Sequence, residues 1–263
     1  MKPTILQEIF EAKKLRVDKR RRDTDMSALM AAARGARSTR EPHRLRNALV
    51  SPGINIIAEF KRASPSQGVI NDMVDPTSIA RSYENAGAKA ISVLTEEDYF
   101  QGSMDDLRTV RDSVSLPILQ KDFIFDEFQI YEAAAAGADA ILLIVAMLGD
   151  ETLKHLHRVA RELGIDALVE VHNAGEMQRA VATGANLIGI NNRNLHTFEV
   201  SLDISRHLIK SAPDEAIIVA ESGLKTRNDL AELSGLGFKG FLIGETLMRS
   251  NDPESELRRL VTI

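Results

Sequence analysis

Short apolar runs recur along the chain at a regular interval, each introduced by a glycine. Four segments share the order helix end, glycine, one or two linking residues and apolar run: 86–93, 136–143, 183–190 and 236–243. The four glycines lie 50, 47 and 53 residues apart, at Gly87, Gly137, Gly184 and Gly237. Glycine suits the position just past a helix, which often takes a left-handed conformation. Apolar runs this short are typical of strands buried on both faces.

Four further apolar runs lie between these segments and bring the predicted strands to eight. They cover 54–60, 116–120, 167–171 and 216–220. Strands and helical segments therefore alternate about every 25 residues, which is the βα pattern of a parallel sheet. A doubly wound open sheet also alternates, but eight evenly spaced units with a fourfold internal repeat favour closure. The sequence predicts an α/β protein with the (βα)8 TIM-barrel fold.

Residues 1–50 precede the first predicted strand and are interpreted as two or three short helices. Thr4 opens the first helix, and apolar residues follow at Ile5, Leu6, Ile9 and Phe10. We interpret 1–50 as an N-terminal helical extension and 51–263 as the barrel catalytic domain, the two forming one structural domain. Such an extension can close the bottom of the barrel, rim its mouth or contact other molecules, and the sequence favours none of the three.

Charge is distributed unevenly between these two parts. The net charge is −5, yet residues 1–50 carry 13 Lys and Arg against 6 Asp and Glu. A nucleic-acid-binding arm would explain this excess, but aromatic residues do not interleave with the charges, and apolar positions recur at helical spacing. We therefore expect solvated amphipathic helices and no nucleic-acid partner.

The chain of 263 residues contains no cysteine. Disulfides, thiolate metal sites and cysteine nucleophiles are therefore excluded, and a reducing compartment is compatible with the composition. The N-terminal sequence lacks the apolar segment of a signal peptide, and no stretch approaches the length that a membrane span requires. We expect a cytoplasmic protein with no membrane partner.

Two patterns that suggest cofactor or metal chemistry lack the context which that chemistry needs. Segment 235–240 matches the dinucleotide pattern GxGxxG, but it ends a predicted helix and precedes a strand, the reverse of the required order. His155 and His157 are two apart on a predicted helix and point to different sides. The sequence therefore predicts neither a cofactor nor a metal.

Charged residues occur where the predicted strands end, which is where this fold places its chemistry. Glu59 and Lys61 are two apart at the end of the first strand, so both side chains point to one face. Lys121 ends the third strand, and Glu170 interrupts the apolar fifth strand. Buried charges are costly unless they are paired or used. We interpret these residues as catalytic candidates, with an internal layer of salt bridges as the alternative.

Convergence of these groups at one mouth would change their acidity. Neighbouring ammonium groups disfavour each other's charged form, whereas a carboxylate favours it. One lysine could then act as general acid, and Glu170 as general base, near neutral pH. The sixth strand ends in Asn191, Asn192 and Arg193, which add a neutral hydrogen-bonding side chain and a planar cation at the same rim.

Glycine-containing loops follow the seventh and eighth strands. Segment 221–223 (Glu-Ser-Gly) and segment 244–246 (Gly-Glu-Thr) each lead into a helix. Loops at these two positions repeatedly bind phosphate in this fold, through backbone amides and a helix N-terminus, so we predict a phosphate site. The long loop after the first strand, which begins at 61–68, is interpreted as a lid or substrate-contacting segment, or else as a passive surface loop.

Six blocks at the ends of successive predicted strands closely resemble the indole-3-glycerol phosphate synthase family. They cover 59–66, 94–103, 121–123, 168–172, 188–195 and 220–223. The resemblance runs over essentially the whole chain. It implies a carbon–carbon lyase of tryptophan biosynthesis, in which 1-(2-carboxyphenylamino)-1-deoxyribulose 5-phosphate loses CO2 and water and closes to indole-3-glycerol phosphate. It also implies that no cofactor or metal is needed.

The resemblance implies roles for individual residues. Lys121 would protonate the substrate carbonyl as the aryl carbon attacks it, and Glu170 would remove a proton and stabilise developing positive charge. Lys61, with Glu59 as its partner, would contact the substrate carboxylate, and either lysine could be the acid of the dehydration step. Asn191 and Arg193 would orient Glu170 and the substrate hydroxyls, and Phe100 and Phe123 would flank the aromatic ring. The phosphate would be held by Ser64, Ser222, Gly223, Gly244 and Glu245. Glu221 would bind substrate in the same segment as Ser222.

Small departures from the family pattern concern the phosphate site. Ala63 stands where some members have lysine, and Glu245 and Thr246 stand where others have two serines. A side-chain hydroxyl contact would then be missing while the backbone donors remain. The chain also ends after its eighth predicted helix, so we expect the monofunctional form, without a fused phosphoribosylanthranilate isomerase barrel.

Two other functions fit parts of this pattern. Another phosphate-binding TIM-barrel enzyme, such as an isomerase or a Schiff-base aldolase, would also place a lysine at the mouth. A noncatalytic scaffold that uses the basic extension predicts instead that the mouth charges are dispensable. Under the preferred hypothesis the partner is a phosphorylated small molecule, and the protein is a monomer or a weak homo-oligomer.

Overall fold

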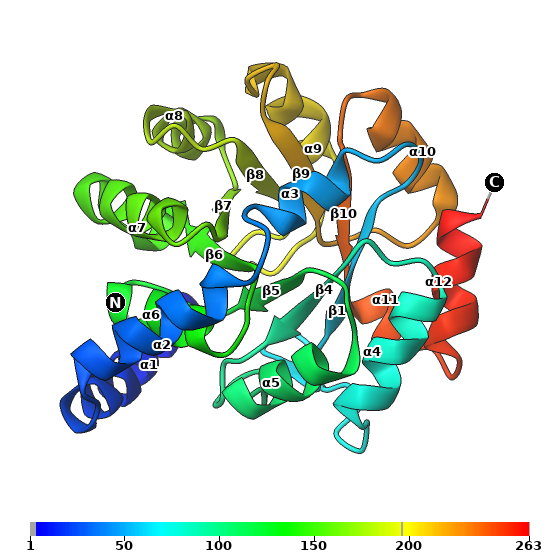
Figure 1. The fold of residues 1–263 in the computed structure, drawn as a ribbon. Coiled ribbons are helices and arrows are strands. Elements are labelled where there is room, and N and C mark those ends of the chain that lie inside the picture. Colours follow the sequence, from blue (N-terminus) through cyan, green and yellow to red (C-terminus); the bar gives the residue numbers. More distant parts are fainter. Residues whose placement is uncertain (1–3, 196, 263) are drawn as a thin grey trace.

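A computed structural model describes residues 4–195 and 197–262. Within them, eight parallel strands close into a barrel in the order β1-β10-β9-β8-β7-β6-β5-β4, so the predicted TIM-barrel fold is confirmed (Figure 1). The barrel strands are β1 (Ile56–Phe60), β4 (Ala90–Leu94), β5 (Ile118–Lys121), β6 (Ala140–Ile144), β7 (Asp166–Val171), β8 (Leu187–Asn191), β9 (Ile217–Glu221) and β10 (Gly240–Ile243).

Helices surround the barrel and connect its successive strands (Figure 1). The helices of this outer layer are α4 (Pro76–Asn85), α5 (Met104–Ser113), α6 (Glu127–Ala135), α7 (Asp150–Glu162), α8 (Ala174–Ala182), α9 (Asp203–Leu208), α10 (Arg227–Gly235) and α12 (Pro253–Val261). Shorter elements lie in the connections: the hairpin of β2 (Ala63–Ser64) and β3 (Gly68–Val69), η1 (Val145–Met147), η2 (Ile209–Ser211) and α11 (Glu245–Met248). Across 4–195 and 197–262, no helix combines the length and the apolar character needed to cross a membrane.

The glycine-led pattern in the sequence corresponds to the turn that precedes alternate barrel strands. All four glycines have a positive φ, of 92°, 90°, 77° and 114° at Gly87, Gly137, Gly184 and Gly237. Each lies two residues past the end of a helix and three before β4, β6, β8 or β10 begins. The predicted left-handed conformation after a helix is therefore confirmed, and the strands that follow are buried along their length.

Alternate side chains along each strand point into the barrel, where they form two kinds of layer. Toward the amino ends of the strands the interior is apolar, with a buried cluster that includes Ile57, Ala90, Leu119, Leu168 and Val219. Two residues further along several strands, the same face carries charge: Glu59, Lys121, Glu170 and Glu221. The apolar layers therefore form a floor beneath a charged mouth.

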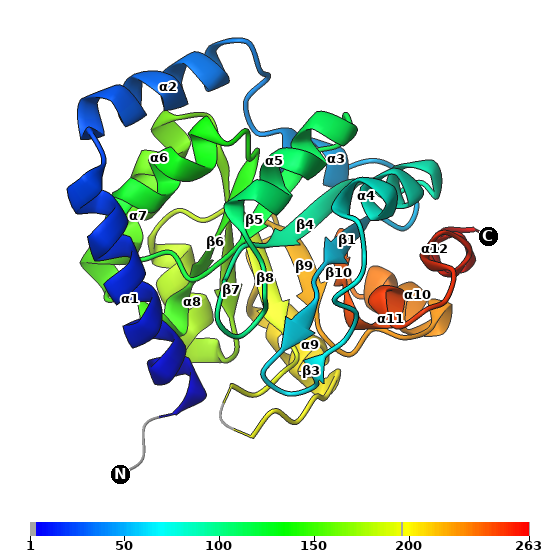
Figure 2. The same cartoon turned by 90° about the horizontal axis from the view of Figure 1, so that it is seen from below.

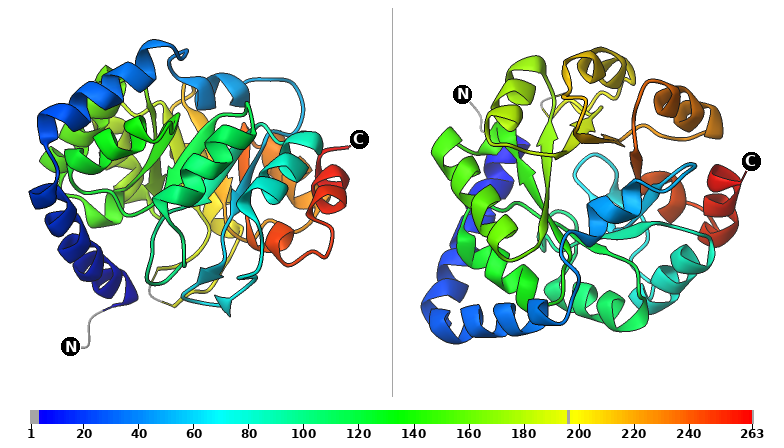
Figure 3. Two further views of the ribbon diagram at one scale, coloured as in Figure 1. Left: turned by 60° about the horizontal axis from the view of Figure 1, so that its bottom comes forward. Right: turned by 45° about the horizontal axis from the view of Figure 1, so that its top comes forward.

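The N-terminal extension contacts both ends of the barrel through its three helices, α1 (Ile5–Asp23), α2 (Met26–Ser38) and α3 (Arg44–Leu49). Leu45 and Leu49 of α3 are fully buried in the interior cluster, and Leu49 packs against Gly240 at the amino end of β10. Figure 2 shows α2 and α3 at one end of the molecule, with α1 running along the side to the other end. The extension therefore closes the bottom and also reaches the mouth (Figure 3).

Buried ion pairs fix α2 and α3 beneath the barrel. Asp139, at the amino end of β6, is fully buried, and its carboxylate lies 3.1 Å from the guanidinium of Arg37 and 2.9 Å from those of Arg44 and Arg111. The same carboxylate accepts the backbone N–H of Ile118 at 3.1 Å. Breaking a buried pair is costly because it leaves an uncompensated charge.

We expect Asp139→Asn to lower the free energy of unfolding by about 3 to 5 kcal/mol, because the amide leaves the buried Arg37 guanidinium without a carboxylate. Equilibrium unfolding in urea measures this loss. Asp105→Asn is the matched control, since Asp105 is 88% exposed and its pair with Arg108 should contribute less than about 1 kcal/mol. Equal losses in the two variants would contradict an anchoring role for Asp139.

Candidate active site

A cavity of about 1090 Å³ lies at the carboxyl ends of the barrel strands. Every residue that the sequence predicted for the site lines this cavity: Glu59, Lys61, Ser64, Phe100, Lys121, Phe123, Glu170, Asn191, Arg193, Glu221, Ser222, Gly223, Gly244 and Glu245. They come from strands and loops that are distant in sequence. Closure of the barrel therefore brings the two predicted constellations, the charged residues and the glycine-containing loops, into one space.

Two ion-pair groups form the polar base of the cavity. The Lys121 ammonium at the end of β5 lies 2.9 Å from a carboxylate oxygen of Glu170 and 3.1 Å from one of Glu221. The Lys61 ammonium, just past β1, lies 2.7 Å from Glu59. All three glutamates are almost fully buried, whereas the two lysines retain some exposure to the cavity.

Two glycines provide the space that these carboxylates occupy. A Cβ on Gly189, in the middle of β8, would lie 2.0 Å from Oε1 of Glu221. A Cβ on Gly244, just past β10, would lie 2.3 Å from Oε1 of Glu59. Each glutamate side chain therefore occupies the space that a Cβ would need, so both positions require glycine. An isolated glycine in a strand is a signal of such close approach, and the sequence prediction did not use it at Gly189.

Lys121 and Glu170 hold each other ionised. Burial disfavours the charged form of Lys121, but the carboxylates of Glu170, Glu221 and Glu59 outweigh burial and raise its pKa above the ordinary value. Burial likewise disfavours the Glu170 carboxylate, but Lys121 and His172 outweigh it and hold the pKa of Glu170 well below its usual range. At neutral pH the pair is therefore an ammonium beside a carboxylate.

Glu221 differs from Glu170 because one ammonium cannot fully compensate two buried carboxylates. Burial, together with the negative charge on Glu170, raises the pKa of Glu221 to about 8, although Lys121 opposes the shift. Its Oε1 atom is buried and has no hydrogen-bond partner among the described residues. The sequence grouped Glu221 with the phosphate-binding loop, whereas the structure places its carboxylate on Lys121. No local motif signals this contact, because it joins β5 to β9 across the barrel.

His172 forms a second contact to Glu170 from just beyond β7. Its Nε2 atom lies 3.4 Å from Glu170, and its Nδ1 atom lies 3.0 Å from Glu176. Burial lowers the pKa of His172, but the two carboxylates outweigh burial and raise it to about 10. An imidazolium at this position adds positive charge beside Glu170 and restricts the orientation of its carboxylate.

The loops after β9 and β10 form the opposite side of the cavity. Ser222 and Gly223 both have a positive φ, of 67° and 78°, in the turn that follows β9. Glu245, the first residue of α11, lies 3.5 Å from the guanidinium of Arg193 and 3.3 Å from that of Arg249. The carboxylate that replaces a serine of the family pattern is therefore paired with cations, and the loop backbone remains beside the cavity.

An apolar wall completes the site. The rings of Phe100 and Phe123 lie 6.2 Å apart between centroids and are tilted by 43°. The sequence did not select the apolar residues that line the cavity beside them, namely Leu142 and Ile144 from β6 and Ile5, Leu6 and Ile9 from α1. The apolar run of β6 and the apolar start of α1 are visible in the sequence, but only the packing of α1 against the mouth makes these residues part of the site.

A closed βα barrel with lysines and glutamates gathered at the carboxyl ends of its strands defines a TIM-barrel enzyme. The chain belongs to the indole-3-glycerol phosphate synthase family, since the model of that family matches residues 6–260. Members of this family are carboxy-lyases of tryptophan biosynthesis, so the predicted family and enzyme class are confirmed.

Individual relatives agree with this assignment. The chain is 42% identical to indole-3-glycerol phosphate synthase of Lachnoclostridium phytofermentans, over 98% of this chain and 99% of that protein. It is 45% identical to the enzyme of the same name from Sulfurimonas denitrificans, over 97% and 98%. Thiamine phosphate pyrophosphorylase from Pyrococcus furiosus superposes with a TM-score of 0.60 and 18% identity, over 82% of this chain and 95% of that one, a likeness of fold alone.

Proposed function

We propose that this chain converts 1-(2-carboxyphenylamino)-1-deoxyribulose 5-phosphate into indole-3-glycerol phosphate, CO2 and water by general acid–base catalysis. The observation that carries the proposal is the Lys121 ammonium held between Glu170 and Glu221, at 2.9 and 3.1 Å, inside a cavity that also has an aromatic wall and two glycine-containing loops. An acid and a base within hydrogen-bond reach of one substrate are what a ring closure with dehydration requires.

Three parts of the cavity suit three parts of this substrate. The backbone N–H groups of the loops after β9 and β10, with Ser64 and Ser222, bind the phosphate. The carboxyphenyl ring lies against Phe100 and Phe123, where apolar side chains continue the wall. The substrate carboxylate contacts the Lys61 ammonium, and Asn191 and Arg193 orient Glu170 and the hydroxyl groups. Substrate held at both ends brings its aryl carbon close to its carbonyl carbon.

The proposed chemistry uses the charges in sequence. Lys121 donates a proton to the carbonyl oxygen as the aryl carbon that bears the carboxylate attacks the carbonyl carbon. CO2 then leaves that aryl carbon, and the electrons of the broken bond restore the aromatic ring. Departure of the carboxylate frees Lys61, with Glu59 as its partner, to protonate the hydroxyl group that leaves as water. Glu170 stabilises the positive charge on nitrogen and removes the proton that completes the indole.

Trapping and product analysis separate this function from that of a lysine-dependent aldolase. We expect equimolar amounts of CO2 and of indole product, measured by its absorbance, when the protein is incubated with the substrate. Borohydride added during turnover should leave Lys121 unmodified, because no Schiff base forms. A borohydride-stable adduct on Lys121 without CO2 release would instead support an aldolase.

The proposal also predicts that kcat falls as pH rises through about 8, the raised pKa of the Glu221 carboxyl. Loss of that proton places a second full carboxylate on the Lys121 ammonium, which raises the pKa of Lys121 and makes it a weaker acid. In Glu221→Gln the side chain stays neutral, so the alkaline decrease should disappear. Measuring kcat at saturating substrate from about pH 6 to about pH 9.5 tests this prediction, and an unchanged decrease in the variant would contradict it.

We propose further that the enzyme acts in the cytoplasm as a monomer or weak homo-oligomer and does not bind nucleic acid. Several basic residues of the extension are engaged within the chain, which supports the last point. Arg16 pairs with Asp98, Arg20 with Glu132, and Lys13 with Asp122. Salt-dependent retention of the protein on DNA at physiological ionic strength would contradict it.

A further inference from the structure

Lys13 is a buried cation on a helix whose neighbouring charges are exposed. It lies near the middle of α1 and is 1% exposed, whereas the adjacent Lys14 is exposed. Its ammonium lies 2.7 Å from a carboxylate oxygen of Asp122 and 2.8 Å from one of Glu97. Burial of a lysine is unfavourable unless it is paired, so the position of Lys13 depends on these two carboxylates.

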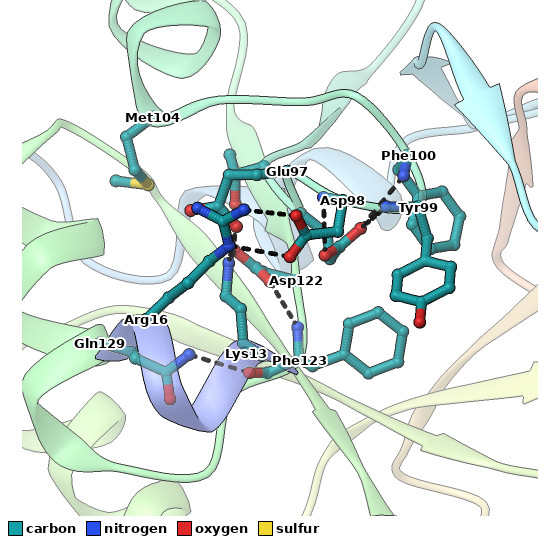
Figure 4. Close-up of polar contacts among 12 residues, drawn as sticks. Lys13, Arg16, Glu97, Asp98, Tyr99, Phe100, Met104, Asp122, Phe123 and Gln129 are labelled. Atoms are coloured by element: carbon teal, nitrogen blue, oxygen red, sulfur yellow. Dashed lines mark hydrogen bonds and ion pairs between the residues drawn. The ribbon is translucent and has the colours of Figure 1, made fainter. Parts of the chain in front are cut away.

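The two partners of Lys13 belong to two different loops at the mouth of the barrel. Asp122 lies directly between Lys121 and Phe123 at the end of β5, and Glu97 lies in the connection from β4 to α5, three residues before Phe100. Figure 4 shows the Lys13 side chain reaching from α1 to both partners, with the rings of Phe100 and Phe123 beside the cluster. One ammonium therefore joins the two loops that supply the aromatic pair of the cavity.

Hydrogen bonds connect this ion cluster to the backbone of Phe123. Oδ1 of Asp122 accepts the backbone N–H of Phe123 at 2.8 Å, and Oδ2 accepts the hydroxyl of Thr95 at 2.5 Å. The Gln129 side-chain amide donates to the carbonyl of Phe123 at 2.8 Å (Figure 4). A rotation of the Asp122 carboxylate would therefore shift the backbone on which both Phe123 and Lys121 depend.

The loop that carries Phe100 is fixed in a similar way. The Glu96 carboxylate accepts the backbone N–H groups of Asp98, Tyr99 and Phe100 at 3.0, 2.7 and 3.0 Å, which holds this segment in a tight turn. Next to Glu96, Glu97 is bound by both Lys13 and Arg20 of α1. The turn is therefore rigid within itself, and α1 sets its place relative to β5.

We propose that Lys13 is a positioning residue of the active site, which sets the separation of Phe100 and Phe123 and the direction of Lys121 by binding Asp122 and Glu97 together. This inference rests on the proposed function, in which the two rings flank the aromatic ring of the substrate. Lys13 does not line the cavity and acts only through its two partners. A small misplacement of reacting groups is enough to reduce a reaction rate strongly.

The test is Lys13→Met, which keeps the length of the side chain and removes its charge. We expect kcat for indole-3-glycerol phosphate formation to fall by about 10-fold or more, with KM changed by less than about 3-fold, because the phosphate and carboxylate contacts remain. Glu97→Gln removes one of the two contacts at a partly exposed position and should lower kcat in the same sense by a smaller factor. If Lys13→Met does not fold, the kcat of Glu97→Gln tests the positioning role of Lys13 in its place.

Two control variants separate positioning from stability. Lys14→Met changes the exposed neighbour of Lys13, and Glu132→Gln removes a partner of Arg20 on α6 instead of one in the loop. Both should retain the kcat of the unmodified protein, whatever their unfolding temperature. The positioning role would be overturned if folded Lys13→Met had a lower unfolding temperature but an unchanged kcat, or if Glu97→Gln had an unchanged kcat. The proposed function would stand in either case. Absence of turnover by the unmodified protein would overturn the proposed function, and this inference with it.

Discussion

Replacing Glu170 with glutamine should reduce kcat by at least about 100-fold, since general acid–base groups commonly contribute that much or more. The amide has nearly the shape of the carboxylate, but it can neither accept the proton that completes the indole nor stabilise positive charge on nitrogen. The barrel should remain folded, because Lys121 keeps Glu221 as a partner at 3.1 Å. Steady-state kinetics with the carboxyphenylamino substrate, beside a circular dichroism spectrum, measures both effects.

Glu151→Gln is the matched control for this variant. Glu151 is 94% exposed on α7 and lies outside the cavity. It should show the kcat of the unmodified protein. Near-normal turnover in Glu170→Gln would exclude Glu170 as the base.

Lys121→Ala should be at least as damaging, with a kcat loss of about 100-fold or more and a nearly unchanged fold. The substitution removes the proton donor for the carbonyl oxygen and leaves Glu170 and Glu221 buried without an ammonium between them. Their carboxyl groups then favour the protonated form, since like charges at short range disfavour ionisation. We therefore also expect the variant to be less stable than the unmodified protein at neutral pH and to recover stability as the pH is lowered.

Lys154→Ala, on the exposed face of α7, provides the comparison for Lys121→Ala. Its kcat and its stability should follow those of the unmodified protein across the pH range. If Lys121→Ala turned over at a comparable rate, Lys121 would not be the acid of the condensation step. A fall in stability without a fall in kcat would make the cluster a structural layer of salt bridges, the alternative that the sequence left open.

Much of the fold followed from local signals in the sequence. The eight strands were predicted because each is a short apolar run, and because glycines with a positive φ precede four of them, at Gly87, Gly137, Gly184 and Gly237. The mouth residues were predicted because a charge such as Glu170 within a strand that is buried on both faces needs a partner or a function. Both signals lie in the neighbours of a residue along the chain.

The contact that Glu221 makes across the barrel was not predicted. Glu221 was grouped with the phosphate loop because its sequence neighbours are Ser222 and Gly223. Its carboxylate instead forms an ion pair with Lys121, 100 residues earlier in the chain. The relevant clue was Gly189 on β8, the strand next to β9 in the barrel, whose missing side chain leaves the space for Glu221. Its meaning depends on the strand register, which periodicity does not give.

The place of the N-terminal extension also depended on tertiary structure. Closing the bottom and rimming the mouth were separate possibilities in the sequence, and the structure shows that α3 does the first and α1 the second. The basic character of α1 belongs partly to the same arrangement, because Lys13 and Arg20 bind carboxylates that lie more than 70 residues away. A charge count alone cannot separate such internal pairs from a solvated face.

Fluorescence of the product shows most directly whether the charged mouth of this barrel closes an indole ring. The chain has no tryptophan, so indole fluorescence that develops in the reaction comes from the product alone. With synthetic 1-(2-carboxyphenylamino)-1-deoxyribulose 5-phosphate, fluorescence should rise at a rate proportional to the protein concentration and should be almost absent with Glu170→Gln. If the folded, unmodified protein produced no indole fluorescence from this substrate, it would not be an indole-3-glycerol phosphate synthase.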